Sequence, residues 1–146
     1  MKYCNCHEYL QDVGLLVLRL SIGLMMSLGH GLAKFSQFFQ GGEIQFADPI
    51  GIGTNLSFYL VGTTEFILSL MVVVGLFTRW AAIPLIFTMS VAVLIVHGAQ
   101  TFVEKEIALL YLFSFLTILL TGPGKISVDY WIKNKFCQKS KIDLQV

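Results

Sequence analysis

The chain has 146 residues, of which 55% are hydrophobic and only 13% charged, and it carries a net charge of +1. Soluble domains carry about 25% charged residues, so about half of the usual polar coat is missing. These values favour a one-domain protein embedded in a lipid bilayer, and they exclude nucleic acid as the main partner because no basic face exists outside the tail.

Four apolar windows approach the ~20 residues that a bilayer-crossing helix needs. They cover residues 13–35, 56–77, 80–98 and 107–121. Only Thr78-Arg79 interrupts the second and third, which predicts a tight helical hairpin there. The fourth window is short and needs part of 102–106 or of 122–126 to reach full length. We therefore predict an all-α fold, an integral membrane antiparallel four-helix bundle, with a soluble helical bundle as the alternative.

Lysine and arginine gather on one side of this predicted bundle, which comprises the N-terminus, the hairpin turn and the tail. That side holds Lys2, Arg79, Lys125, Lys133, Lys135, Lys139 and Lys141. The opposite side holds only Lys34 and Lys105. Cytoplasmic loops carry the excess of basic residues, so we predict both termini in the cytoplasm and the cell (inner) membrane as the location.

The segments outside the four apolar windows are an outer loop and a basic tail. The outer loop, residues 36–55, is rich in turn signals and also in apolar residues, so we expect it to cap the bundle or to lie on the membrane surface. Residues 1–129 form the predicted four-helix membrane domain, and 130–146 form a basic cytoplasmic tail. Aromatic residues and lysines in 127–136 predict a short interfacial helix. Cys4, Cys6 and Cys137 are sparse and odd in number, which fits a reducing compartment and leaves their role open.

Polar and small residues form one seam on each predicted helix at about 100° per residue. The seams are Arg19, Gly23, Ser27, His30 and Lys34; Gly62, Glu65 and Ser69; Arg79, Ser90 and His97; and Glu106, Phe113 and Thr117. Ionisable residues at membrane depth face the protein interior, so we expect the seams to converge, with Arg19 extending toward Glu65. Two interpretations stay open: a polar cavity that holds a ligand headgroup or relays a proton, and an interhelical ion pair that fixes packing.

His30 and His97 each begin a His-Gly-x-x-x-Phe sequence at the outer end of a helix. This similarity suggests a parallel repeat of two helical hairpins. Two adjacent imidazoles with Glu104 or Glu106 would form an outward-facing proton-transfer or metal site. The alternative is a pair of interfacial histidines bonded to loop carbonyls. The Cys4-Asn5-Cys6-His7 spacing is not that of a zinc site, so no metal site is predicted there.

Six segments of the chain, taken in order, resemble one protein family. They are residues 14–20, 30–35, 62–66, 75–79, 106–111 and 121–129. The last, Thr-Gly-Pro-Gly-Lys-Ile-Ser-Val-Asp, is the most recognisable. Together they are similar to the DoxX family of small four-helix membrane proteins. The resemblance implies a membrane subunit linked with oxidoreductases, as in the membrane part of thiosulfate:quinone oxidoreductase or in proteins of thiol redox balance.

The resemblance and the seams give a function hypothesis. It is a membrane subunit that binds a quinone-like lipid, a ligand that needs an apolar slot, hydrogen-bond donors and a proton carrier. The candidate ligand or proton-relay residues are Arg19, His30, Lys34, Glu65, Arg79, His97 and Glu106. The chain has no complete catalytic motif and no Cys pair beside the membrane core, so whether it is an enzyme stays open.

The second hypothesis is a non-catalytic membrane anchor or assembly factor for a soluble partner, using the basic tail and the apolar outer loop. The expected partners are the lipid bilayer, a soluble redox protein and further copies of the chain, since Gly23, Gly62 and Ser69 permit close helix contacts. The sequence does not fix the substrate, the electron partner or the oligomeric state.

Overall fold

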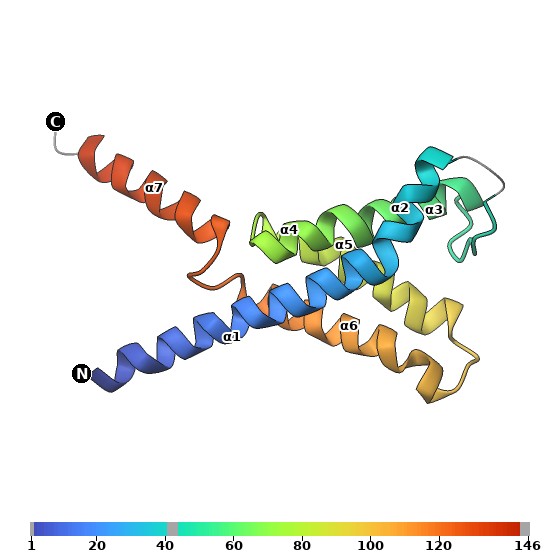
Figure 1. The fold of residues 1–146 in the computed structure, drawn as a ribbon, viewed down its shortest axis with the longest axis horizontal. Coiled ribbons are helices and arrows are strands. Elements are labelled where there is room, and N and C mark those ends of the chain that lie inside the picture. The colour runs from blue at the N-terminus through green and yellow to red at the C-terminus, as the bar shows by residue number, and fades with distance from the viewer. Residues whose placement is uncertain (1, 41–43, 144–146) are drawn as a thin grey trace.

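A computed structural model describes the backbone of residues 2–40 and 44–143 and the side chains of residues 7–40 and 44–136. All regular structure in these ranges is helical (Figure 1). Three segments are long and apolar enough to cross a membrane: His7–Gln40, Thr54–Val74 and Thr78–Val96. The side chains of Cys4, Cys6 and Cys137, and the predicted turn at residues 41–42, lie outside the described ranges.

Each of these three segments contains a π-helical turn between or after its α-helices. The first consists of α1 (Lys2–Met26), η1 (Ser27–Gly31) and α2 (Leu32–Gln40). The second consists of α3 (Thr54–Thr63), η2 (Thr64–Leu68) and α4 (Ser69–Val74), and the third of α5 (Thr78–Val91) and η3 (Ala92–Val96). Two regular helices follow, α6 (Phe102–Thr121) and α7 (Val128–Asp143). Because π turns are rare and frequently occur at functional sites, their positions are informative.

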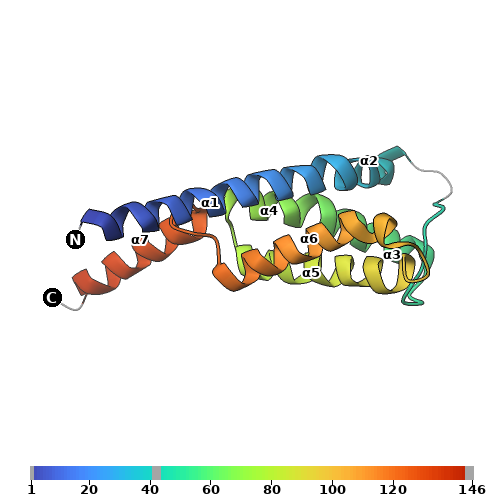
Figure 2. The same cartoon turned by 90° about the horizontal axis from the view of Figure 1, so that it is seen from below.

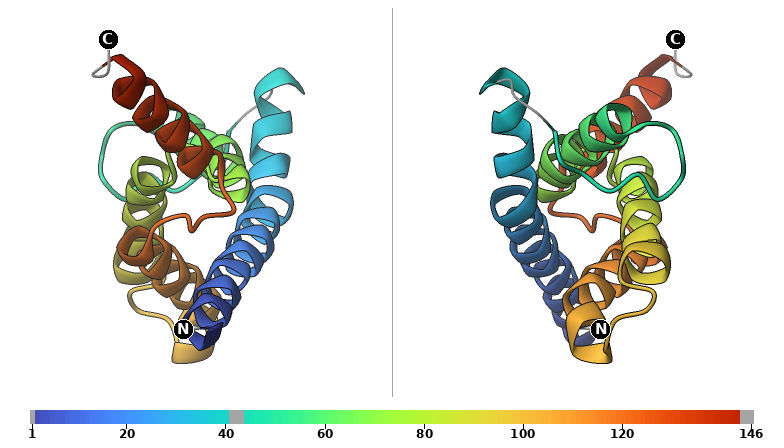
Figure 3. Two further views of the ribbon diagram at one scale, coloured as in Figure 1. Left: turned by 90° about the vertical axis from the view of Figure 1, so that its left-hand side faces the viewer. Right: turned by 90° about the vertical axis from the view of Figure 1, so that its right-hand side faces the viewer.

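The helices pack side by side around a narrow apolar core. α4 packs on α1 and α5, and α6 packs on α5 and α1 (Figure 2), so α1 and α5 are diagonally opposite when viewed along the molecule (Figure 3). The largest apolar side chains that are fully buried are Met26, Val72, Leu85, Phe115 and Ile118. The first turns of α1 and the whole of α7 extend beyond the α4–α5 turn, at the end away from residues 44–53 (Figure 1).

Large apolar side chains cover the outside of the molecule. Trp80, Leu94 and Leu120, for example, are 75%, 73% and 71% exposed. Monomeric soluble proteins rarely expose such wide apolar surfaces, because water penalises them. The same surface is favourable in hydrocarbon, so the exposed side chains are those expected of helices that contact lipid.

The helix boundaries extend the predicted windows. α1 begins at Lys2, well before residue 13, and α6 begins at Phe102. The start of α6 is set by a capping box, in which the Thr101 amide and hydroxyl both donate to the Glu104 carboxylate at 2.8 Å. Such a box satisfies backbone groups that the first helical turn leaves without partners. α6 therefore takes its extra length at its N-terminal end, one of the two extensions allowed by the sequence.

The predicted seam of the fourth helix is wrong. Phe113 and Thr117 are exposed, and the buried face of α6 instead carries Tyr111, Phe115 and Ile118. The Thr117 hydroxyl donates to the Phe113 carbonyl of its own helix at 2.8 Å. A hydroxyl that is satisfied in this way can face lipid, so its polarity does not indicate the interior side.

A tight turn joins α4 to α5 and is held from a distant part of the chain. Gly75 adopts φ 74° and Phe77 φ 45°, so both lie in the left-handed region. The Asp129 carboxylate accepts hydrogen bonds from the amides of Phe77 and Thr78, at 2.7 and 2.9 Å, and from the Thr78 hydroxyl at 2.9 Å. Asp129 thus caps α5 although it belongs to the first turn of α7. The predicted hairpin is confirmed. Its stabilisation by Asp129 was not predicted from the sequence.

Candidate functional site

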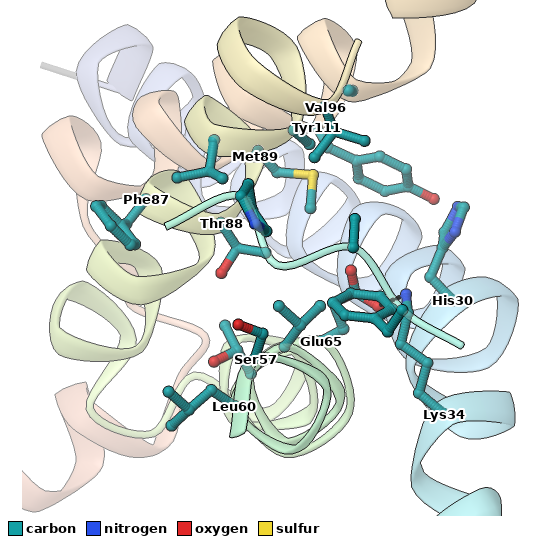
Figure 4. A pocket seen from close by; sticks show the side chains of 18 of the residues that line it. His30, Lys34, Ser57, Leu60, Glu65, Phe87, Thr88, Met89, Val96 and Tyr111 are labelled. Atoms are coloured by element: carbon teal, nitrogen blue, oxygen red, sulfur yellow. Dashed lines mark hydrogen bonds and ion pairs between the residues drawn. The ribbon is translucent and has the colours of Figure 1, made fainter. Parts of the chain in front are cut away.

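A cavity of about 560 Å³ lies near the outer-loop end of the molecule, between the helices (Figure 4). Its wall is mostly apolar, and residues 46–52 of the outer loop close one side. Cavities that bind small molecules usually measure about 300–1,000 Å³ and combine apolar walls with a few polar groups. All three π turns contribute to the wall, through His30, Glu65 and Val96 among others.

Lys34 and Glu65 form the charged centre of this cavity. The Lys34 Nζ atom lies 2.5 Å from Glu65 Oε2, and Figure 4 shows the two side chains pointing toward one another. Glu65 is buried, whereas the Lys34 side chain keeps 23% of its surface exposed. Charge-assisted hydrogen bonds of this kind are the strong ones, and pairing lets both charges exist in an apolar wall. The two residues lie on the predicted seams of the first and second helices.

His30 and Tyr111 form a second polar contact in the cavity wall. Their ring centroids are 5.6 Å apart, and the two rings are perpendicular (Figure 4). Tyr111 is buried and comes from α6, which packs beside the segment that carries His30. Tyr111 is not among the residues predicted from the sequence. Its only sequence signal is a hydroxyl on an aromatic ring at membrane depth, which also fits an ordinary core residue.

The π turn η1 changes which residues of the first segment face the second. The predicted seam placed His30 in the interior, yet His30 is exposed at the cavity edge and Gly31 is buried. A π turn takes more residues than an α turn, so it rotates every later residue relative to a regular helix. Gly31 consequently faces the backbone of Glu65, and Lys34 enters the cavity.

His97 and Glu104 line the outer rim of the same cavity. The His97 Nδ1 atom interacts with the side-chain amide oxygen of Gln100, and Glu104 is engaged in the capping box of α6. Glu106 is exposed and does not line the cavity. His30 and His97 therefore both line this cavity. Within residues 7–40 and 44–136, no three His, Cys, Asp or Glu side chains are grouped for a metal ion.

Arg19 lies at the opposite end of the molecule from Glu65, so the predicted approach of the two is wrong. Its Nη2 atom donates to the Ile126 carbonyl at 2.5 Å, and its guanidinium packs on the Gly75 backbone. The side chain is fully buried, and the Asp129 carboxylate is close enough to act on its charge. Arg19 therefore ties α1 to the α4–α5 turn and to the segment before α7.

Arg79 also lies outside the cavity. Its Nη2 atom donates to the Leu120 carbonyl at 3.4 Å, and its side chain is exposed beside Gly122 at the end of α6. A cation near the last carbonyls of a helix interacts favourably with the helix dipole. Arg79 thus joins the end of α6 to the start of α5. Of the seven candidates, four line the cavity: His30, Lys34, Glu65 and His97.

Asp48 organises the outer loop where it covers the cavity. Its carboxylate accepts the Ser57 hydroxyl at 2.8 Å and the amides of Ile52 and Gly53 at 3.1 and 2.7 Å. These hydrogen bonds, first of all the one from Ser57, hold the pKa of Asp48 below its usual value. The carboxylate fastens the loop to the first turn of α3, which begins at Thr54.

The loop should loosen when Asp48 loses its charge. Because the folded pKa of Asp48 is depressed, its contribution is complete above the unfolded value of about 3.9 and is lost as the pH falls through the folded value. We expect Asp48→Ala to accelerate hydrogen exchange at the Ile52 and Gly53 amides at neutral pH. Gln45→Ala, an exposed change in the same loop, is the control. Equal exchange in Asp48→Ala and wild type would contradict the assigned hydrogen bonds.

Apolar helices of membrane-crossing length, an apolar exterior and a largely apolar cavity with few polar groups define the chain as a helical membrane protein. It belongs to the DoxX family, whose model matches residues 14–98. This match covers the first segment from residue 14 onward and the whole of the second and third segments, with Arg19, Lys34 and Glu65, and it ends before α6.

Two relatives come from Haemophilus influenzae, and both carry only the description "Uncharacterized protein". One is 33% identical over 132 residues, covering 84% of this chain and 90% of the relative. The other is 27% identical over 147 residues, covering 96% and 97%. No solved structure matches the chain.

Proposed function

We propose that the chain is a multi-pass inner-membrane protein, a four-helix bundle with both termini in the cytoplasm, that binds a quinone-like lipid in its cavity. In this proposal it is the membrane subunit of an oxidoreductase system. The observation that carries the proposal is the Lys34–Glu65 pair, a buried carboxylate and an ammonium group in an otherwise apolar hollow of ligand size.

The distribution of charge supports this orientation. Lys125, Lys133 and Arg79 lie at the end where α4 turns into α5 and α7 begins, while Lys34 and Lys105 lie toward the other end. Basic residues favour the cytoplasmic side. The cavity then opens near the outer face of the membrane, and residues 44–53 form its cover.

The cavity residues match the chemistry of a quinone. Quinone carbonyl oxygens accept hydrogen bonds, which the Lys34 ammonium group and the Tyr111 hydroxyl can donate. Reduction to the quinol takes up two electrons and two protons, and Glu65 and His30 are groups that can carry protons at this site. The electrons come from a partner oxidoreductase in this proposal. The chain's own contribution is to hold the ring and to move protons.

Removing both charges of the pair should abolish tight binding. A single change would leave one charge buried without its partner and would destabilise the fold. We therefore expect Lys34→Met/Glu65→Gln in lipid nanodiscs to bind menaquinone and ubiquinone about 10- to 100-fold more weakly than wild type, the effect of losing hydrogen bonds to charged groups. The measurement is equilibrium titration of the purified protein.

Glu106→Gln is the matched control, because it neutralises an exposed carboxylate outside the cavity. It should leave the dissociation constant unchanged. Saturable binding that is equal in wild type and the double variant would place the ligand elsewhere. Absence of binding of both quinones to wild type would remove the proposal and leave the anchor function for a soluble partner.

A further inference from the structure

A second hollow adjoins the cavity on the outside of the molecule, between α1 and α6. It measures about 450 Å³ and is lined by Leu24, Met25, Leu28, Gly29, His30 and Tyr111. We call it the α1–α6 groove. His30 and Tyr111 also line the cavity, so this pair of side chains forms the partition between the two hollows.

The partition is thin and weakly held. His30 is exposed rather than packed in the core, and it meets Tyr111 through a single edge-to-face contact, a weak interaction. Gly29 adds no side chain at the groove, and a Cβ there would meet no atom within 4 Å. The exposed His30 side chain therefore has room to rotate away from the buried Tyr111, at the place where the two hollows meet.

The size of the cavity requires such an opening for a tailed ligand. A hollow of this volume encloses a ligand of drug size, whereas a membrane quinone carries a long isoprenoid chain. In a quinone the chain is attached next to a carbonyl carbon, so it leaves the ring close to a hydrogen-bonded oxygen. A ring whose oxygen meets Tyr111 or His30 directs its chain toward the partition.

We infer that the isoprenoid chain of the bound lipid passes between His30 and Tyr111 and lies in the α1–α6 groove. This inference rests on the proposed function and adds to it the path of the chain and the residues that select a tailed ligand. The groove is lined by the apolar side chains of Leu24, Met25 and Leu28, and it is open to the hydrocarbon of the bilayer, where the rest of the chain belongs.

Filling the groove should discriminate between a quinone with a chain and the same ring without one. The two probes are menaquinone and dimethylnaphthoquinone, which has the menaquinone ring with a methyl group in place of the chain and offers cysteine thiols no free ring position. We expect Gly29→Phe to weaken menaquinone binding at least about tenfold by obstructing the chain, with the binding of the chainless ring unchanged.

Gly14→Phe is the matched control, because Gly14 is also on α1 and a Cβ there also meets no atom within 4 Å. It should change neither affinity. Gly29→Leu, a smaller obstruction, serves if the phenylalanine variant fails to fold. Leu60→Trp tests another exposed part of the cavity wall, on α3.

The outcomes separate this inference from the proposed function. Binding of neither probe to wild type would remove both. If wild type binds both probes, and Gly29→Phe changes the two affinities equally or changes neither, the proposed path of the chain is overturned. The quinone site itself would remain. Selective loss of menaquinone in Leu60→Trp but not in Gly29→Phe would also overturn it, because the chain would then leave beside α3.

Discussion

Gly31→Ala should destabilise the protein, whereas Gly29→Ala, two residues away in the same π turn, should not. A Cβ at Gly31 would lie 2.6 Å from the Glu65 carbonyl carbon and the Phe66 amide nitrogen. These are backbone atoms, so the two helical segments must move apart. Overpacking of this kind costs about 1–3 kcal/mol. At Gly29 the new methyl group meets nothing, and alanine gains up to about 1 kcal/mol of helix propensity.

Thermal unfolding in detergent, followed by circular dichroism, measures the difference. We expect the midpoint to fall for Gly31→Ala and to stay equal or rise for Gly29→Ala. Because Gly31 packs on the residue that carries the site carboxylate, Gly31→Ala should also weaken quinone binding. Equal midpoints for the two variants would mean that the first and second segments do not meet at Gly31.

Asp129→Ala should have the second large effect, because it removes three hydrogen bonds at once. The amides of Phe77 and Thr78 and the Thr78 hydroxyl would lose their acceptor at the start of α5. Loss of a helix N-cap alone costs up to about 2 kcal/mol. The change also removes the negative charge of Asp129, which interacts with the buried positive charge of Arg19. A buried charge without a compensating partner lowers the stability of the fold further.

Glu8→Ala provides the comparison for Asp129→Ala. The carboxylate of Glu8 pairs with Lys125 at 2.7 Å, but both side chains are more than half exposed. Surface pairs contribute about 0–1 kcal/mol, so its unfolding midpoint in detergent should change little. If the midpoint of Asp129→Ala falls no further than that of Glu8→Ala, the turn between α4 and α5 does not depend on residue 129.

Local patterns were sufficient for the helices and for part of the site. Hydropathy located the helices because length and apolar content decide whether a segment can cross a bilayer. The seams of the first two helices also predicted that Lys34 and Glu65 face the interior, where the two side chains pair. The sequence also contains a signal for the start of α6, since Thr101 and Glu104 have the spacing of a capping box.

The remaining features depend on contacts that no local pattern contains. Regular 100° spacing fails at His30 and Gly31 because both lie in the π turn η1, so Gly31 is buried where His30 was expected. Tyr111 joins the site only because α6 packs beside α1. Arg19 is buried, as expected of an ionisable residue in a membrane helix, but its partner is the Ile126 carbonyl, 107 positions along the chain. Charge alone could not distinguish that partner from Glu65.

The hydrogen bonds of Asp129 also show that the packed part of this protein includes the first turn of α7. Helix α6 ends at Thr121, yet the Asp129 amide donates to the Gly75 carbonyl at 2.9 Å and its carboxylate caps α5. A truncation or fusion junction chosen from hydropathy, directly after Thr121, would remove part of the hairpin between the second and third segments. Junctions for reporters or affinity tags therefore belong beyond the first turn of α7.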